Sequence, residues 1–224
     1  MKKIYVVGGR GYWSYANWLE PLGIIPTDEY KSCDMVLFAG GEDVSPEIYS
    51  NKIPHRSVSS NINRDEREQI IYNKALADKK PMLGICRGSQ YLCVMANNLD
   101  EHSLVQHQSQ PGFNHPMKCA EGGEITVTST HHQSQWPFNL PENDYELLGW
   151  TENGCSQRWF NEEGKVKEVY PNLGHIEVEE VYYKKINALG LQHHPEYVFP
   201  PNNNQDSKYI ERCQNLVKKY LISE

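Results

Sequence analysis

Short apolar runs alternate with amphipathic stretches through the first hundred positions of the chain. Three runs predict buried strands, at residues 3–7, 34–39 and 81–85. Three segments between and after them repeat apolar positions at helical intervals and predict helices, at residues 14–22, 64–79 and 87–97. Asp65 and Glu68 have the spacing of a capping box at the start of the second helix. Alternating strands and helices are typical of an α/β fold with a parallel sheet.

The pattern becomes less regular after residue 99. Residues 100–123 and 151–175 are rich in polar side chains and predict two long loops. Four further segments predict strands, at residues 124–128, 145–150, 176–183 and 187–192. A last helix is expected over residues 206–221, where apolar side chains form one stripe. Since no repeat or linker divides the chain, we expect a single domain spanning residues 1–224.

Composition excludes several classes of protein. The net charge is −7 and no stretch is dense in Lys and Arg, so nucleic acid is not an expected partner. No apolar run reaches the roughly 18 residues of a membrane span, and the run after Met1 is too short for a signal peptide. We therefore expect a cytoplasmic protein.

The chain has six cysteines, none of them in a CxxC pair. That spacing favours neither a zinc site nor a redox motif, and no metal or organic cofactor is expected. In a reducing cytosol these residues are expected to remain thiols. One of them stands apart because of its neighbours.

Cys86 lies between Gly84 and Gly88, after a predicted strand and before a predicted helix. This arrangement has the form of a nucleophile elbow, in which a sharp turn exposes the nucleophile and leaves room only for glycine two positions away. The turn also places the sulfur at a helix N-terminus, where the dipole favours a thiolate. The alternative is a chance Gly-x-Cys-x-Gly sequence, and the strand and helix on either side argue against it.

A thiolate nucleophile needs a base, and the base needs an orienting acid. Both residue types occur in the segment His194-Pro195-Glu196, at the end of another predicted strand. Proline fixes the turn, so Glu196 can reach back to the imidazole. A polar surface turn is the alternative, but this segment and the elbow both stand at strand ends.

Together these motifs resemble the class I glutamine amidotransferases, and most closely their gamma-glutamyl hydrolase-like branch. The matching blocks follow one another in family order between residues 34 and 196: Gly40-Gly41-Glu42-Asp43-Val44-x-Pro46-x-x-Tyr49, Arg64-Asp65-x-x-Glu68, Lys80-Pro81-x-Leu83-Gly84-Ile85-Cys86-Arg87-Gly88-x-Gln90, Ser129-x-His131-His132-Gln133 and His194-Pro195-Glu196. The resemblance implies a three-layer, flavodoxin-like α/β fold with a mostly parallel central sheet.

The resemblance also implies a role for particular residues. Cys86 would attack the side-chain amide carbon of glutamine or of a gamma-glutamyl compound and form a glutamyl-thioester. His194 would act as base and then as acid, and Glu196 would orient it. The backbone N–H groups of Arg87 and of the loop at Gly41 and Glu42 would form the oxyanion hole.

Three more residues are implied as contacts of the glutamyl group, namely Gln90, His131 and His132. For these the alternatives remain open: Gln90 as a helix cap, and the two histidines as residues that shape a loop. His193 stands where the family often has an aromatic residue or glycine, which predicts a changed pocket wall. The family's Asp-Gly-x-Ile-Glu stretch has no clear counterpart near residues 175–180.

Three functions are compatible with these residues. The first is a free-standing thiol-dependent hydrolase of gamma-glutamyl amides. The second is a glutaminase subunit that supplies ammonia to a separate synthetase or ligase, because the chain has no nucleotide-binding loop of its own. The third is a non-catalytic binding module on the same fold, which the intact set of Cys86, His194 and Glu196 argues against.

Overall fold

The computed structural model describes residues 1–49, 59–98, 104–107, 113–131, 133–152, 159–160, 166–167 and 176–222. Its centre is a nine-stranded sheet with the order β2-β1-β3-β4-β13-β12-β9-β6-β7. The strands are β1 (Lys2–Val6), β2 (Ile24–Thr27), β3 (Met35–Phe38), β4 (Met82–Ile85), β6 (Phe113–Cys119), β7 (Glu124–Ser129), β9 (Tyr145–Thr151), β12 (Glu177–Tyr183) and β13 (Ala188–Leu191). Strands β2 to β13 in this order are parallel, as in flavodoxin-like sheets, and the remaining strands pair antiparallel. The predicted fold class is confirmed.

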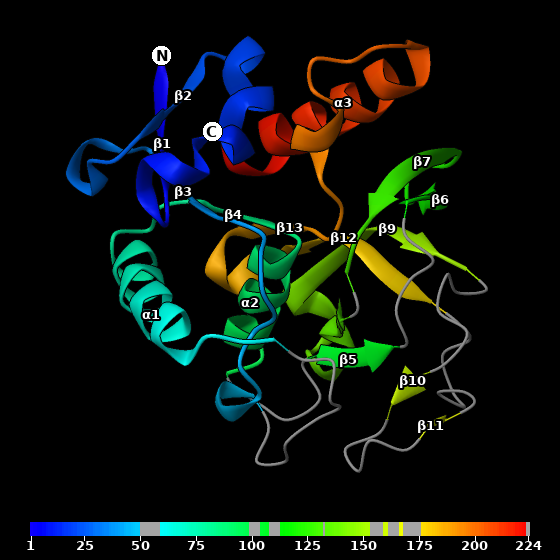
Figure 1. Ribbon diagram of the computed structural model, residues 1–224, viewed down its shortest axis with the longest axis horizontal. Coiled ribbons are helices and arrows are strands. Elements are labelled where there is room, and N and C mark those ends of the chain that lie inside the picture. Colours follow the sequence, from blue (N-terminus) through cyan, green and yellow to red (C-terminus); the bar gives the residue numbers. More distant parts are fainter. Residues whose placement is uncertain are drawn as a thin grey trace.

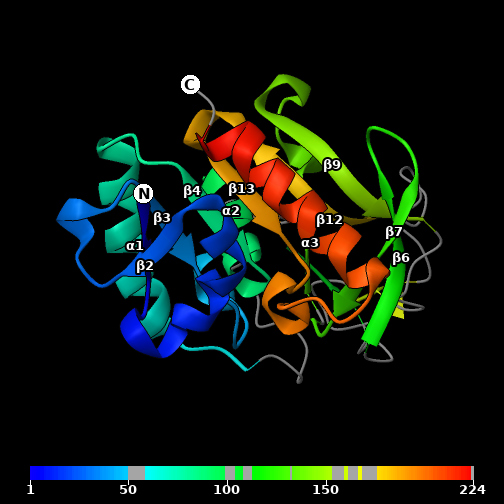
Figure 2. The same ribbon diagram turned by 90° about the horizontal axis from the view of Figure 1, so that it is seen from above.

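Helices cover both faces of the parallel half of the sheet. On one face lie α1 (Ile62–Ala77) and α2 (Arg87–Ala96), and on the other lie α3 (Asn204–Val217) and the 3₁₀ segment Gly9–Leu22 (Figures 1 and 2). A short π-helical turn, Lys218–Ile222, continues α3. None of the described helices combines the length and the apolar character needed to cross a bilayer.

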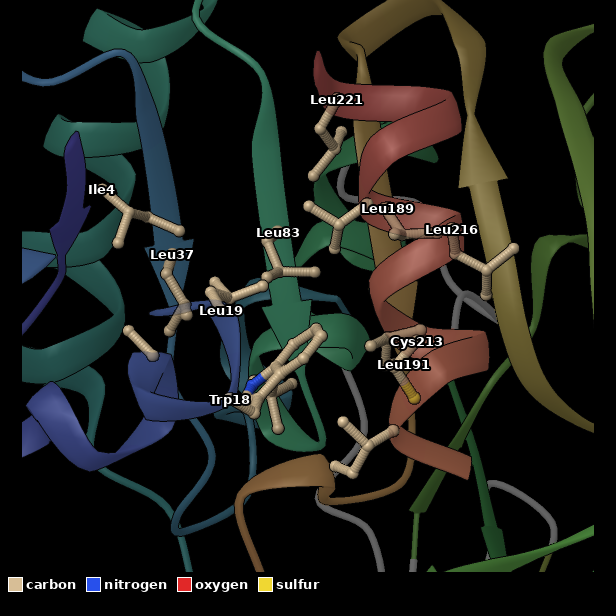
Figure 3. Packing of buried hydrophobic residues seen from close by; sticks show 14 of the residues in the cluster. Ile4, Trp18, Leu19, Leu37, Leu83, Leu189, Leu191, Cys213, Leu216 and Leu221 are labelled. Carbon is tan, nitrogen blue, oxygen red and sulfur yellow. The ribbon is translucent and has the colours of Figure 1, made fainter. Parts of the chain in front are cut away.

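The three layers follow from the alternation of side chains along the central strands. In β3, Met35 and Leu37 face the α3 side, whereas Val36 and Phe38 face α1 and α2. Both sets are almost completely buried, which is why this strand reads as a continuous apolar run. Figure 3 shows Leu37 and its neighbours on the α3 side packed around Trp18 and Leu19.

The prediction of a loop over residues 100–123 is wrong. Strand β6 lies there, and its alternation of exposed and buried positions does not appear as an apolar pattern because two of the inward side chains are His115 and Cys119. Four short strands form a second antiparallel sheet with the order β11-β10-β5-β8: β5 (Leu104–His107), β8 (Gln133–Gln135), β10 (Trp159–Phe160) and β11 (Val166–Lys167). The predicted loop at 151–175 contains β10 and β11, and most of its other residues lie outside the described part of the chain.

Three smaller expectations also change. Strand β2 was not predicted because it contains Pro26, which an edge strand tolerates. The segment predicted as a helix over 14–22 is a 3₁₀ segment that begins at Gly9. The capping box is wrong as well, since the side chain of Asn61 caps α1 by accepting a hydrogen bond from the Arg64 N–H at 3.3 Å. Asp65 and Glu68 are instead buried.

Candidate active site

Three neighbouring parallel strands bring the predicted residues to one edge of the sheet. Cys86 follows β4 directly, His194 lies just beyond β13, and the loop with Gly40 and Gly41 follows β3. The β4–β13 register continues to the site, because the Cys86 N–H donates to the Leu191 carbonyl at 2.7 Å. Carboxyl ends of parallel strands form the usual binding edge of such sheets. Thus the topology collects residues that are far apart in the sequence.

The backbone at Cys86 is held in a strained conformation. Its φ is 50° and its ψ is −110°, and the residue stands immediately before α2. Few L-residues adopt a positive φ, and such strain is concentrated at functional sites. A β-carbon on Gly84 would lie 2.6 Å from the Gly88 backbone, and one on Gly88 would overlap the Phe38 carbonyl. The turn therefore requires both glycines, as predicted.

His194 and Glu196 form a buried hydrogen-bonded pair. The Nδ1 atom of His194 lies 2.6 Å from Oε1 of Glu196. Pro195 opens the 3₁₀ turn Pro195–Val198, which carries the carboxylate back beneath the imidazole. The His194 N–H is also fixed, since it donates to the Thr128 hydroxyl at 2.7 Å. With Nδ1 bonded to the carboxylate, the other ring nitrogen remains for proton transfer.

Charge around His194 changes its protonation. Burial disfavours the imidazolium, but the neighbouring Cys86 sulfur and the Glu196 carboxylate outweigh it and raise the pKa of His194 to about 10. At neutral pH the imidazole is therefore protonated beside the sulfur. A protonated imidazole at this position can supply the acid that a leaving amine needs.

Replacing Glu196 with glutamine is expected to shift the alkaline limb of kcat/KM to lower pH. The wild-type limb should fall as pH rises through the His194 pKa of about 10, because the imidazolium is then lost. Since Glu196 helps to raise that pKa, removing its charge lowers it. The measurement is the pH–rate profile of both proteins. Glu20→Gln, which changes an exposed glutamate, is the control. An unchanged alkaline limb would show that Glu196 does not raise the pKa of His194.

The loop after β3 lies against the imidazole. A β-carbon on Gly40 would lie 3.0 Å from Cε1 of His194, and Gly41 has a φ of +133° that favours glycine. Burial opposes charge on Glu42, yet its own backbone N–H and the Arg64 guanidinium outweigh it and lower the pKa of Glu42. Because the Glu42 N–H faces its own carboxylate, Gly41 is the better candidate for an oxyanion donor.

Arg87 begins α2, so its backbone N–H has no partner within the helix. That N–H is adjacent to the Cys86 sulfur in the sequence and stands at the positive end of the helix dipole. The Arg87 side chain turns away from this edge and is buried against Asp65 and Glu68. The amide therefore remains available as the second predicted oxyanion donor.

The predicted substrate contacts have different surroundings. Gln90 is buried, donates from Nε2 to the Gln133 carbonyl at 2.8 Å and does not cap a helix. Its Oε1 has no hydrogen-bond partner among the described residues and can accept from a ligand. His131 is buried with Nδ1 2.8 Å from the same carbonyl, and His132 lies outside the described residues.

The ring of His193 points toward α3, whereas that of His194 lies against Glu196 and the loop at Gly40. The His193 ring is buried between Glu180, at 3.2 Å, and the Tyr209 hydroxyl of α3, at 2.7 Å. The prediction that His193 changes the pocket wall is therefore wrong, because its ring is enclosed by Glu180 and Tyr209 instead. Glu180, His193 and Cys213 lie close enough to hold a metal ion, but Arg212 is already paired with Glu180 there.

Three residues at this edge were not singled out from the sequence. Gln192 is buried with Nε2 3.9 Å from the Cys86 sulfur, and Tyr197 stacks on the His194 ring with centroids 4.2 Å apart. Both lie within two residues of the His-Pro-Glu motif, which is the signal that could have found them. Tyr15 comes from the 3₁₀ segment Gly9–Leu22, and its hydroxyl would lie 3.0 Å from a β-carbon on Gly40. Nothing in the local sequence marks it.

Comparison with known proteins relates the chain to a family. A family model described as Peptidase C26 matches residues 26–196. A glutamine amidotransferase-like protein of Rickettsia prowazekii is 29% identical, over 84% of this chain and 77% of that protein. The carbamoyl phosphate synthase small chain of Campylobacter jejuni is 30% identical, over 64% of this chain and 32% of that protein.

A solved structure shows the same fold at low sequence identity. The crystal structure of a glutamine amidotransferase from Thermotoga maritima superposes with a TM-score of 0.56 at 14% identity. The match covers 99% of this chain and 86% of that one. The similarity therefore includes the antiparallel part of the sheet as well as the parallel part.

Proposed function

The chain belongs to the Peptidase C26 family of class I glutamine amidotransferase-like proteins, and from this premise we propose that it hydrolyses gamma-glutamyl amide bonds through a glutamyl-thioester. The observation that carries the proposal is the strained turn at Cys86 beside the buried His194–Glu196 pair. A nucleophile, a base and an orienting acid in this relation are what thiol-dependent acyl transfer requires.

The proposed reaction has two stages. The Cys86 thiolate attacks the amide carbon, and the charge that develops on oxygen is stabilised by the N–H groups of Gly41 and Arg87. His194 gives its proton to the nitrogen, the carbon–nitrogen bond breaks and the amine leaves. Water then attacks the thioester, His194 takes the proton, and the carbon–sulfur bond breaks to release glutamate and the thiolate.

We favour a free-standing hydrolase of the gamma-glutamyl hydrolase-like branch, because the loop at Gly40 and Gly41 is anchored within this chain. The buried Arg64 guanidinium donates to the Ala39 carbonyl at 3.0 Å and to the Gly40 carbonyl at 2.9 Å. A loop held in this way needs no partner protein to order it. The second candidate is a glutaminase subunit of a synthetase, which the similarity to a carbamoyl phosphate synthase small chain favours.

The purified chain is expected to cleave gamma-glutamyl amides of bulky amines faster than free glutamine, without ATP or a second protein. No partner should be needed, because the anchored loop leaves the oxyanion donors in place. The assay measures glutamate release from glutamine and from a panel of gamma-glutamyl amines, with the matching alpha-glutamyl amides as controls. If no compound of the panel is hydrolysed, and glutaminase activity follows when a co-encoded synthetase is added, the second candidate is supported.

A further inference from the structure

Behind the candidate active site lies a buried network of charged side chains that the reaction itself does not use. Arg64 donates to the loop carbonyls of Ala39 and Gly40, to Glu42 at 2.7 Å and to Glu68 at 2.8 Å. The guanidinium thus forms hydrogen bonds to three residues of the loop that carries one predicted oxyanion donor. A β-carbon on Gly41 would collide with it, so the two lie in direct contact.

The other predicted donor belongs to Arg87, and its side chain enters the same network. The Arg87 guanidinium is 1% exposed and donates to Glu68 and to Asp65. Asp65 in turn accepts from the Ser45 N–H at 3.0 Å, further along the loop that follows β3. Two elements that carry the two oxyanion donors are therefore tied to one helix, α1.

Glu68 is the residue that both arginines share. Its Oε1 accepts from Arg64 and its Oε2 accepts from Arg87, so each carboxylate oxygen serves one half of the site. We propose that Glu68 is a positioning residue that fixes the distance between the two halves of the oxyanion hole. This inference rests on the proposed function, because only a reaction that forms an oxyanion needs that distance.

Stability alone is a poor reason for such a network. A buried ion pair often contributes no more than well-packed apolar side chains would, because desolvating the charges is costly. Oxyanion donors, in contrast, act only when they lie about 2.7–3.1 Å from the developing charge. A shift of about 1 Å can reduce a rate about a hundredfold. The charged network contacts the two elements whose N–H groups need to be placed with this precision.

The test replaces Glu68 with glutamine, which keeps the shape of the side chain. Its amide NH₂ group, a donor, takes the place of a carboxylate oxygen that accepted from one of the arginines. We expect kcat on a gamma-glutamyl anilide to fall about tenfold to a hundredfold, with KM little changed. Alkylation of Cys86 by iodoacetamide forms no oxyanion, so its rate should not change. Glu66→Gln on the exposed face of the same helix is the matched control.

Other outcomes would overturn the inference. Unchanged kcat, or a loss shared equally by hydrolysis and alkylation, would indicate that Glu68 has no role or only a structural one. If Glu68→Gln does not fold, Arg64→Lys keeps the charge but loses the fork of donors, and it should show the same selective loss of kcat. An Arg64→Lys protein with normal kcat would count against the network.

A gamma-glutamyl aldehyde separates this inference from the proposed function. The Cys86 thiolate bonds to its carbonyl carbon and the negative charge passes to the oxygen, so an oxyanion forms although no amine has to leave. If the wild-type chain hydrolyses no amide, the proposed function fails, yet weaker aldehyde binding by Glu68→Gln would still support the positioning role. Equal binding by the two proteins, or binding by neither, would overturn it.

Discussion

Replacing Cys86 with serine is expected to abolish hydrolysis of gamma-glutamyl amides, with a loss of about 10⁴-fold or more. Serine has nearly the same shape, so the turn at φ 50° should still form. Its hydroxyl, however, is a weaker nucleophile than the sulfur of a cysteine. The measurement is the single-turnover rate of wild-type and variant proteins, with thermal unfolding as a check that both are folded.

The same residue is expected to be the only thiol labelled by a glutamine-mimicking diazo-ketone. Burial raises the pKa of the Cys93 thiol to about 12, so it stays neutral and unreactive. Burial also raises the pKa of three other described thiols, at Cys33, Cys119 and Cys213. Cys119→Ser should therefore keep the label and Cys86→Ser should lose it. Equal labelling of the Cys86→Ser protein would contradict the assignment.

Replacing His194 with asparagine is expected to be as damaging, with a loss of about 10⁴-fold or more in kcat. Asparagine can still bond to Glu196, but it cannot carry the proton from the thiol to the leaving amine. Because His194 has a pKa of about 10, its removal also takes away the positive charge beside the sulfur. Single-turnover rates on one gamma-glutamyl amide measure the effect.

His193→Phe is the matched control for that experiment. The ring of His193 is bonded to Glu180 and Tyr209 on the α3 side, so its loss should leave the chemistry largely intact. Leaving the buried Tyr209 hydroxyl without that partner is expected to cost about 1–3 kcal/mol of folding stability. A larger kcat loss in His193→Phe than in His194→Asn would overturn the choice of base.

Sequence patterns predicted the strands of the parallel sheet that carry the site. The runs at 34–39, 81–85 and 187–192 became β3, β4 and β13 because strands buried on both faces are continuously apolar. The pattern failed at β6, where histidine and cysteine take inward positions, and at the proline-containing edge strand β2. Periodicity recognises burial only where the buried side chains are apolar.

The Asp65 and Glu68 pair shows a different kind of failure. Their spacing fits a capping box, and a local rule has no means of rejecting that interpretation. Glu68 pairs with Arg64 of the same helix, but the other partners, Arg87 and the Ser45 N–H, come from other elements. Helix spacing determines which residues share a face, but the neighbouring elements determine what that face contacts.

By itself, the sequence determined the conformations that depend on a few adjacent residues. The glycines around Cys86 permit the tight turn, and Pro195 sets the turn that returns Glu196 to His194. Steric limits on φ and ψ act within such short windows, so they can be read without a fold.

Only the tertiary structure decided which distant groups surround these motifs. It placed Tyr15 and the loop at Gly40 against His194, turned His193 toward α3 and joined Arg64 to Arg87 through Glu68. Each of these contacts depends on strand order, register and helix packing, which arise when the whole chain buries its apolar surface. Partners that are distant in sequence leave no trace in a local pattern, because their proximity is a property of the packed sheet and its two helical layers.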